Sequence, residues 1–512
     1  MGFNQTLEIE LPEIEIEGMN IPIIDSLSVK FMQEVKFVPI RQKEDYLELA
    51  VTQPLDFYSL ESIALATNCR ISMYKAEEKE ILKAIEKYYL AATSTMESIV
   101  NETEVSYGLT EDEDIDHLKD IASEAPIIRL VNLIIQKAID MKASDIHLES
   151  FEKELKVRCR VDGILHEVEE VPKRLQAAMI SRIKIMSKLN IAERRLPQDG
   201  RIKINFNGKE IDFRVSTMPT LYGESVVMRI LDQSSIHFDL EGFGFSGDIL
   251  GLFYKMISIP YGMILVTGPT GSGKTTTLYG VLSKINSPEK KIITIEDPIE
   301  YNLNGVNQIQ VKPSIGLTFA NGLRSIVRQD PDVILVGEIR DRETAEIAIQ
   351  SAMTGHLIFS TLHTNDASGA IIRLEDMGIE EYLISSCLIG VLAQRLVRRI
   401  CENCKERVLL SREEVRELKG DGFYLPPDNV FNGRGCEKCG NTGYSGRIGI
   451  FELLLVDKEI RNLIIGRTDA SAIKRKACED KMMKTLREDG WSKVTEGITT
   501  ISEVLRVTQE EL

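Results

Sequence analysis

The sequence predicts an α/β protein whose largest domain is built on a doubly wound parallel sheet. Two continuous apolar runs, at residues 263–266 and 333–336, suit strands that are buried on both faces. A glycine-rich loop directly follows the first run, and helical stretches alternate with the strands. A chain of 512 residues is too long to fold around a single hydrophobic core of ordinary size, so we expect about three domains.

The composition is that of a soluble globular protein. No stretch reaches the length of uninterrupted apolar residues that a membrane-spanning helix requires, and the first residues lack the features of a signal peptide, so we expect a cytoplasmic chain. Of the net charge of −17, most falls in residues 1–120, which hold 25 acidic and 10 basic side chains. This acidity argues against direct binding of nucleic acid, and it favours a basic protein partner or simply a solvated surface.

Changes in composition and in the pattern of expected helices and strands predict the domain boundaries. Residues 1–100 form a small α/β module, with strands in 31–51, a strand at 70–74 and two helices in 55–89, and the acidic segment 101–117 is a linker. Residues 118–238 form an α+β domain that begins with a helix from about 123 to 141 and continues with strands at 145–149, 155–161, 201–206, 210–215 and 225–231. Residues 239–512 form the parallel-sheet domain, which includes a cysteine-containing subdomain at 395–448 and helices at 457–512.

A phosphate-binding loop lies between the apolar strand at 263–266 and a helix that begins at Thr276. The pattern G-x-x-x-x-G-K-T occurs there, where backbone N–H groups, the lysine amine and the helix N-terminus would hold ATP, and the threonine hydroxyl would hold Mg²⁺. Its residues are Gly268, Pro269, Thr270, Gly271, Ser272, Gly273, Lys274 and Thr275.

Acids at the ends of two further strands are candidates for catalysis. Glu338 follows the strand at 333–336, and we expect it to act as the general base, since a surface glutamate rarely follows such an apolar run. Glu296 ends the strand at 292–295 and is expected to organise water or Mg²⁺, although a turn with helix-capping acids is the alternative. His356 and His363 flank the strand at 357–362 and are expected to sense the γ-phosphate, whereas lone histidines more often have structural roles.

Four of the eight cysteines form two C-x-x-C pairs. Cys401, Cys404, Cys436 and Cys439 predict a structural Zn²⁺ site with four protein ligands, and disulfides are the weaker alternative in a cytoplasmic chain. The remaining cysteines are interpreted as small core residues; they are Cys69, Cys159, Cys387 and Cys478.

Four motifs together resemble those of the type II/type IV secretion ATPase superfamily. They are GPTGSGKTTT (268–277), TIEDPIEY (294–301), LRSIVRQDPDVILVGEIRD (323–341) and AMTGHLIFSTLHTNDA (352–367), and the resemblance extends from about residue 121 to 512. It implies a RecA-like ATPase domain, a PAS-like domain that covers the nucleotide, and a homohexameric ring. It also implies that Arg201 and Arg214 of the covering domain reach ATP and that Arg324 and Arg328 belong to the nucleotide site, although any one arginine could be an ordinary surface residue.

The resemblance also implies a particular kind of motor. The tetracysteine segment is similar to that of assembly-type members, and residues 31–89 resemble the module by which type II secretion ATPases dock to a membrane-anchored platform protein. We therefore expect a type II secretion motor, associated peripherally with the bacterial inner membrane and acting on a polytopic platform protein. A type IV pilus extension motor is the second interpretation, and a non-cycling nucleotide-gated scaffold and a DNA-pumping ATPase are remoter ones.

Overall fold

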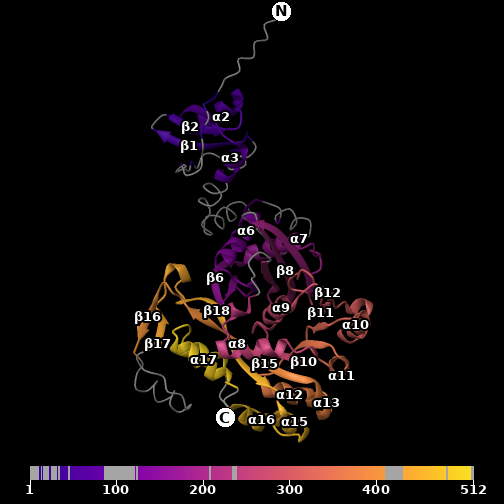
Figure 1. The fold of residues 1–512 in the computed structure, drawn as a ribbon. Helices are drawn as coiled ribbons and strands as arrows, with labels where there is room; N and C mark the ends of the chain where they lie inside the picture. The colour runs from indigo at the N-terminus through magenta and orange to yellow at the C-terminus, as the bar shows by residue number, and fades with distance from the viewer. Residues whose placement is uncertain are drawn as a thin grey trace, which may run out of the picture.

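Three folded parts follow one another along the chain in this computed structural model (Figure 1). The structure describes most of residues 31–85, 125–232 and 239–508, with gaps at 33–34, 44–45, 68, 207–208, 233–238, 410–429 and 480–482, together with residues 11, 12, 14, 22, 24 and 122. The acidic linker predicted at 101–117 lies outside the described residues.

The N-terminal module has a three-stranded sheet with the order β1-β2-β3. Strands β1 and β2 are antiparallel, whereas β2 and β3 are parallel and are connected through α2. Side chains such as Phe37, Leu47 and Ile63 are fully buried between the sheet and the helices, which confirms the predicted strands and helices of this module. Its elements are β1 (Phe37–Lys43), β2 (Tyr46–Val51), α2 (Phe57–Thr67), β3 (Arg70–Lys75) and α3 (Glu78–Ala84).

The middle domain is an antiparallel sheet of six strands with the order β6-β5-β4-β9-β8-β7. Helix α6 buries the apolar side that the sequence predicts, including Ile127, Leu130 and Ile134, against the sheet and α7. The sequence did not predict β6 or α7. The elements are α6 (Ala125–Asp140), β4 (Asp145–Ser150), β5 (Glu154–Val161), β6 (Ile164–Pro172), α7 (Gln176–Met186), β7 (Gln198–Phe206), β8 (Lys209–Thr220) and β9 (Gly223–Asp232).

The third domain contains a seven-stranded sheet with the order β12-β11-β13-β14-β10-β15-β18. Its strands are parallel except for β18, which is antiparallel to β15 at one edge. Every residue of β10, β11, β13 and β14 is buried, because α8 and α9 cover one face and α10 to α13 cover the other. The doubly wound sheet is therefore confirmed, with an antiparallel edge strand that the sequence did not predict.

The strands of this sheet are β10 (Gly262–Thr267), β11 (Ile292–Glu296), β12 (Asn307–Gln310), β13 (Val333–Val336), β14 (Leu357–Leu362), β15 (Leu388–Ile400) and β18 (Tyr444–Leu455). The helices that cover it are α8 (Gly247–Ile257), α9 (Lys274–Ile285), α10 (Phe319–Ile326), α11 (Arg342–Met353), α12 (Ala367–Asp376) and α13 (Glu381–Cys387). Short 3₁₀ turns are η2 (Lys173–Leu175), η3 (Leu240–Phe243), η4 (Pro313–Ile315), η5 (Val327–Gln329) and η6 (Glu437–Cys439).

Strands β15 and β18 extend to a two-stranded ribbon of β16 and β17, at the left of Figure 1. The C-terminal helices then pack against the sheet. These elements are β16 (Lys405–Val408), β17 (Val430–Gly433), α15 (Lys458–Ile465), α16 (Ala470–Glu479), α17 (Leu486–Thr495) and α18 (Ile501–Val507). Among the described residues, no helix is both long and apolar enough to cross a membrane.

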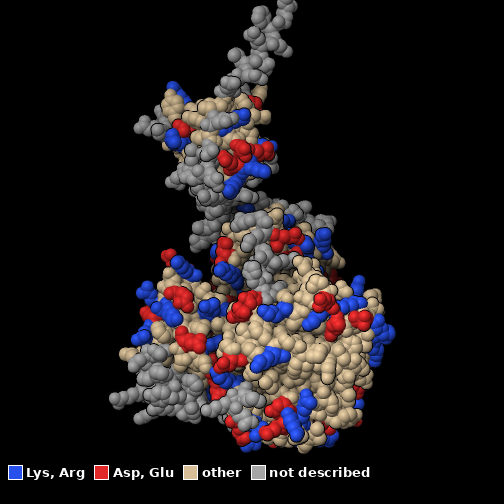
Figure 2. Space-filling model, viewed as in Figure 1, with Lys and Arg blue, Asp and Glu red and all other residues tan. Residues whose placement is uncertain are grey.

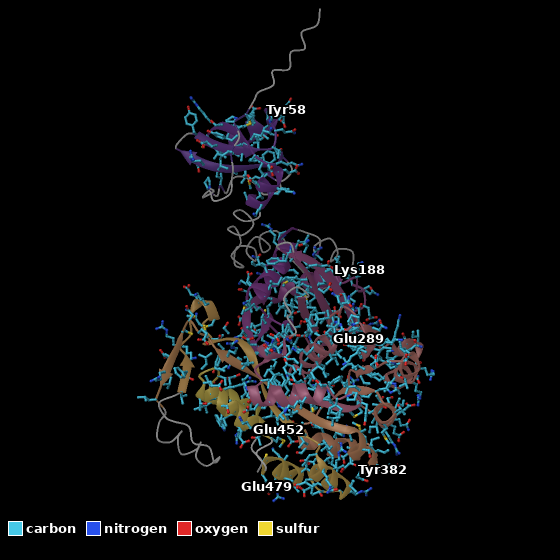
Figure 3. All side chains as sticks on the ribbon, in the orientation of Figure 1. Tyr58, Lys188, Glu289, Tyr382, Glu452 and Glu479 are labelled. Atoms are coloured by element: carbon cyan, nitrogen blue, oxygen red, sulfur yellow. The ribbon has the colours of Figure 1, made fainter. Side chains whose placement is uncertain are left out.

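Glu452, which is labelled in Figure 3, joins β18 to the N-termini of two helices of this domain. The side chain is 1% exposed, and its oxygens accept from the backbone N–H of Ala367 at 2.8 Å and of Leu486 at 3.3 Å. These residues begin α12 and α17, so both helix dipoles favour the carboxylate. Burial nevertheless raises the pKa of Glu452.

The packing of the sheet core leads to a first prediction, which concerns stability. Phe359 in β14 is fully buried against the face covered by α8 and α9, so Phe359→Ala would leave a cavity and lower the free energy of unfolding by about 3–5 kcal/mol. Denaturant unfolding can be followed by the fluorescence of Trp491, the single tryptophan, which is buried in the same domain. Met353→Ala is the control, because Met353 is 51% exposed, and an equal effect of both changes would contradict the assigned core.

Candidate functional site

The glycine-rich loop joins the carboxyl end of β10 to the N-terminus of α9. Gly268, Gly271 and Gly273 have φ values of 149°, 79° and 86°, which side-chain-bearing residues rarely adopt. Gly273 is also the N-cap residue of α9 and offers no side chain to the first turn. The free N–H groups of this helix end are therefore available to an anion.

Lys274 is folded back onto the loop that precedes it. Its Nζ donates to the carbonyl oxygens of Gly268 at 2.8 Å and Pro269 at 3.1 Å. The pKa of Lys274 is lowered to about 8, mainly by burial; the charge of Glu338 opposes this shift and the charge of Arg395 adds to it. Thr275 is exposed beside it at the start of the helix, and Thr276 is half-buried.

Glu338 lies at the same edge of the sheet as the loop. It follows β13, and only β14 separates β13 from β10, so their carboxyl ends are close together. The Glu338 side chain is 15% exposed; it accepts from Arg340 Nη2, and its Oε2 lies 3.6 Å from His363 Nε2. Burial, together with the charge of Lys274, lowers the pKa of His363, which favours its neutral form.

Glu296 ends β11 in a different environment. It is 4% exposed, and its carboxylate accepts from Thr294 Oγ1 at 2.5 Å, from Gln308 Nε2 at 3.1 Å and from the Tyr279 hydroxyl of α9. Burial and the neighbouring Glu296 carboxylate raise the pKa of Tyr279. The oxygens of Glu296 thus hold α9 to β11.

His356 lies at the opposite edge of the sheet. It precedes β14, its carbonyl oxygen accepts from Gly262 N at the start of β10, and its ring Nδ1 lies 2.9 Å from Ser351 O. Six paired residues, from Gly262 with Leu357 to Thr267 with Leu362, separate it from the loop, a length of about 17–20 Å. The expectation that both histidines approach one phosphate of this chain is therefore wrong, because one strand cannot bring both of its ends to the same point.

The arginines of the middle domain form a row across three strands. Arg201 of β7 pairs with Arg214 of β8, which pairs with Arg229 of β9. Arg214 Nη2 donates to Ile299 O at 3.1 Å, and its Nη1 lies 3.5 Å from Glu300 Oε2, so Arg214 contacts the segment that follows β11. Arg201 is exposed.

The sequence interpretation missed several side chains of this region. The only signal for Arg229 is its strand register, which pairs it with Arg214. The only signal for Tyr279 is its position on α9, from which its hydroxyl reaches Glu296. Gln394 and Arg395 of β15 are buried against the loop although they lie more than a hundred residues after it. Of the predicted arginines near β13, Arg324 pairs with Glu343 on α11, and Arg328 is exposed on the surface.

The four cysteines of the two C-x-x-C pairs converge on one point. Their sulfur atoms all lie within 4.8 Å of one another, with separations of 3.9 Å between Cys401 and Cys436, 3.9 Å between Cys404 and Cys439, and 3.7 Å between Cys436 and Cys439. Tetrahedral ligands about 2.3 Å from a Zn²⁺ ion would be about 3.8 Å apart. The cluster is therefore compatible with zinc, and the sulfur separations are too long for disulfides.

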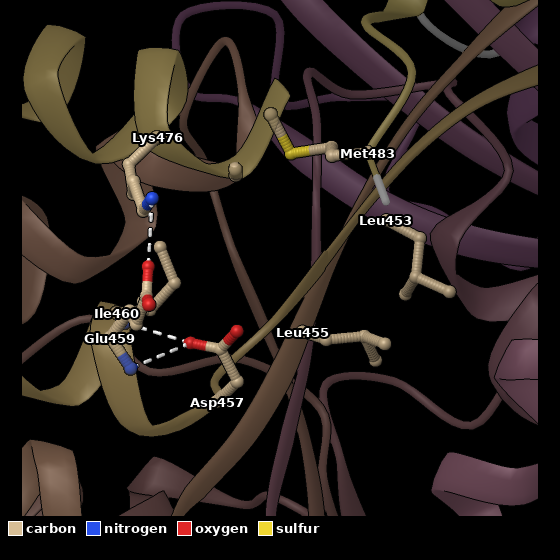
Figure 4. Close-up of a pocket in the computed structure, with 8 residues that line it drawn as sticks. Leu453, Leu455, Asp457, Glu459, Ile460, Lys476 and Met483 are labelled. Atoms are coloured by element: carbon tan, nitrogen blue, oxygen red, sulfur yellow. Dashed lines mark hydrogen bonds and ion pairs between the residues drawn. The ribbon is translucent and has the colours of Figure 1, made fainter. Parts of the chain in front are cut away.

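Two hollows lie away from the loop. The one in Figure 4 is small and lies between β18, α15 and α16, where Lys476 Nζ is 2.8 Å from Glu459 Oε2 and Asp457 caps α15. The other, of about 680 Å³, is lined by residues such as Lys255, Tyr261 and Met353 at the amino edge of β10. Neither is lined by residues of the loop, so neither marks a nucleotide site.

A parallel sheet, a glycine-rich loop before a helix, a lysine in that loop and a carboxylate on a nearby strand define a P-loop nucleoside triphosphatase. Residues 120–506 match the family model described as type II/IV secretion system protein, and residues 8–95 match the MshEN domain. The chain belongs to the type II/IV secretion system protein family.

Individual relatives agree with this family. The type II secretion system protein E of Xanthomonas campestris is 51% identical over 498 residues, which cover 96% of this chain and 86% of that protein. The type IV pilus assembly ATPase PilB of Myxococcus xanthus is 44% identical over 505 residues, covering 97% and 88%. The crystal structure of the pilus retraction motor PilT with bound ADP is 27% identical, has a TM-score of 0.50, and is matched over 75% of this chain and 97% of that one.

The environment of Lys274 leads to a second prediction. With a pKa of about 8, about half of its amine is neutral and nucleophilic at pH 8, whereas an ordinary lysine is almost fully protonated there. We expect trace acetylation of Lys274 across pH 6–11, quantified by mass spectrometry in the nucleotide-free protein, to rise with a midpoint near pH 8. A midpoint near that of the exposed lysines, about pH 10.4, would contradict the burial assigned to this amine.

Proposed function

We propose that this ATPase is the motor of a bacterial type II secretion system, which powers the assembly of a pseudopilus from the cytoplasmic face of the inner membrane. The observation that carries the proposal is the position of Glu338 beside Lys274 at one edge of the sheet, in a chain 51% identical to a type II secretion system protein E. Hydrolysis converts ATP and water into ADP and phosphate at this edge.

The loop residues would bind the phosphates. The free N–H groups of the loop and of the first turn of α9, together with the Lys274 amine, would face the β- and γ-phosphates, and proton uptake by Lys274 is favoured once an anion replaces its carbonyl partners. Thr275 would hold Mg²⁺, whose chemistry is to offset the charge of the β- and γ-phosphates. Thr275 is exposed at the helix N-terminus, as this role requires.

Glu338 is proposed as the general base and Glu296 as a positioning residue. Glu338 keeps a partly exposed carboxylate between Arg340 and His363, so it can accept a proton from the attacking water. Glu296 is more deeply buried and accepts from three side chains, so it positions α9 through Tyr279 instead. His363, held near Glu338 in its neutral form, is proposed to contact the γ-phosphate.

The middle domain is proposed to act as the PAS-like cover of the nucleotide. Its central strands β4 and β9 pair with each other, and its arginine row faces the segment after β11. Closure would carry Arg214, with Arg201 beside it, towards the γ-phosphate and offset charge in the transition state. Arg324 and Arg328 remain candidates for the nucleotide site, which they would reach after a rearrangement of α10.

The assembly and partners are also proposals. A homohexameric ring would be recruited by residues 1–100 to a membrane-anchored platform protein, and it would act on a polytopic platform protein of the inner membrane. A direct role on nucleic acid is disfavoured, because Figure 2 shows acidic and basic side chains intermixed over the visible surface and the net charge is −17. Closure of the covering domain around the ring would drive the platform.

A type IV pilus extension motor is the second candidate, favoured by the 44% identity to PilB over 97% of this chain. Deletion of the gene distinguishes the two functions. Loss of exoprotein secretion with intact surface pili supports the type II motor, whereas loss of pili with intact secretion supports the alternative. ATPase activity that depends on DNA would instead support a DNA pump.

The base assignment makes a third prediction. Glu338→Gln should reduce kcat for ATP hydrolysis by about 10²–10⁴-fold, because the amide cannot accept the proton, while the affinity for ATP stays nearly unchanged. Phosphate release and binding of a fluorescent ATP analogue measure the two effects. Glu346→Gln on the exposed side of α11 is the matched control. Equal, slow hydrolysis by wild type and Glu338→Gln would support the non-cycling scaffold.

The cysteine cluster makes a fourth prediction. We expect about one Zn²⁺ per chain by elemental analysis, since four thiolates make a closed structural site. Cys436→Ser should remove most of the metal and lower the thermal midpoint of unfolding, because metal binding contributes to folding. Cys478→Ser, outside the cluster, should retain the zinc. Metal-free wild type with an unchanged midpoint would contradict the assignment.

A further inference from the structure

A buried glutamine holds the phosphate-binding loop from behind. Gln394 lies on β15 and is 3% exposed. Its Nε2 donates to Ser272 O at 2.8 Å, and its Oε1 accepts from Thr277 Oγ1 at 2.7 Å. One carboxamide thus joins the last part of the loop to the first turn of α9.

Both ends of the loop pack closely against this residue. The backbone carbonyl oxygen of Gln394 would lie 2.5 Å from a Cβ placed on Gly268, and its side-chain Nε2 would lie 2.7 Å from a Cβ placed on Gly273. The same carbonyl oxygen accepts from Arg395 Nη1 at 3.0 Å, and Arg395 Nη2 donates to Asn365 O at 2.6 Å. Gln394 is therefore fixed by its own surroundings and can act as a rigid support.

The bond to Ser272 determines how one peptide group is turned. In a trans peptide the C=O and the following N–H point in opposite directions. Because the Ser272 carbonyl points to Gln394 behind the loop, the N–H of Gly273 points away from β15, towards the inside of the loop. A phosphate in the loop would accept from that N–H group.

We infer that Gln394 is a positioning residue of the ATPase site, which orients the Ser272–Gly273 peptide so that its N–H donates to the β-phosphate of the nucleotide. Gln394 itself does not touch the nucleotide. The inference rests on the proposed binding of ATP to this loop. It adds a specific consequence, because the oriented N–H acts on any nucleotide that carries a β-phosphate, whether or not hydrolysis follows.

The test compares two substitutions that both remove the hydrogen bond between Gln394 and Thr277. Gln394→Met has a similar volume but loses both hydrogen bonds of the carboxamide, including the one to Ser272. Thr277→Val loses only the bond between Thr277 and Gln394 and leaves Ser272 held. A role limited to packing β15 against α9 would affect both variants alike.

Binding of ADP and AMP to the full-length protein, measured by calorimetry, is the main readout. We expect Gln394→Met to raise the Kd for ADP by about 10- to 100-fold, the loss typical of a hydrogen bond to a charged group, and to change the Kd for AMP by less than about threefold. Thr277→Val should change the Kd for ADP by less than about threefold. In ATP turnover, Gln394→Met should raise KM more than it lowers kcat.

Two results would overturn the inference. One is an unchanged Kd for ADP in folded Gln394→Met, and the other is an equal loss in Thr277→Val. If Gln394→Met does not fold, Gln394→Glu replaces it, because glutamate keeps an acceptor for Thr277 but cannot donate to Ser272 when ionised, and the same loss of ADP affinity is expected. Since ADP binding requires no turnover, a wild-type protein that binds ADP but hydrolyses no ATP would contradict the proposed motor and leave this inference intact.

Discussion

The parallel alignment of buried strands is the constraint on which the rest of the structure depends. Strands β11, β13, β14 and β10 are buried on both faces and run parallel to one another, so their backbone polar groups are satisfied within the sheet and their carboxyl ends lie along the same side of it. The glycine-rich loop, Glu338 and His363, which are far apart in the sequence, lie together at these carboxyl ends. The same alignment sends His356 to the other edge.

The antiparallel strands β15 and β18 connect this part of the sheet with the cysteine cluster and the middle domain. Gln394 and Arg395 of β15 support the loop, and the strand continues to Ile400, directly before Cys401. Strand β18 returns from the cysteine cluster, and at its start Gly446 N donates to Asp162 of the middle domain at 2.9 Å, with Arg447 Nε 3.4 Å from the same carboxylate. One strand pair therefore contacts the glycine-rich loop, the cysteine cluster and the middle domain.

Local patterns predicted those parts of the fold that local chemistry determines. The loop, the strands around it, helix α6 and the cysteine pairs each have a short signal of spacing or apolar runs. Strand β6 lacked such a signal because its apolar and charged residues do not alternate regularly and most of them are incompletely buried. Helix α7 lacked one because seven of its eleven residues are buried, polar ones included, which weakens the contrast between its faces. Gln394 and Arg229 could not be predicted, because their roles arise from strand register between distant segments.

The contact of Arg214 with Glu300 bears on the proposed role of the middle domain as a cover of the nucleotide. In this arrangement Glu300 and the Ile299 carbonyl offset the arginine charge, and the Arg214 side chain is only 22% exposed. An incoming γ-phosphate carries more negative charge than one carboxylate, so it competes for the same guanidinium. The exchange of partners would cost little free energy, because one anion replaces another while the arginine remains paired. Under the proposed closure, a middle domain held by exchangeable ion pairs would follow the charge of the nucleotide through each cycle.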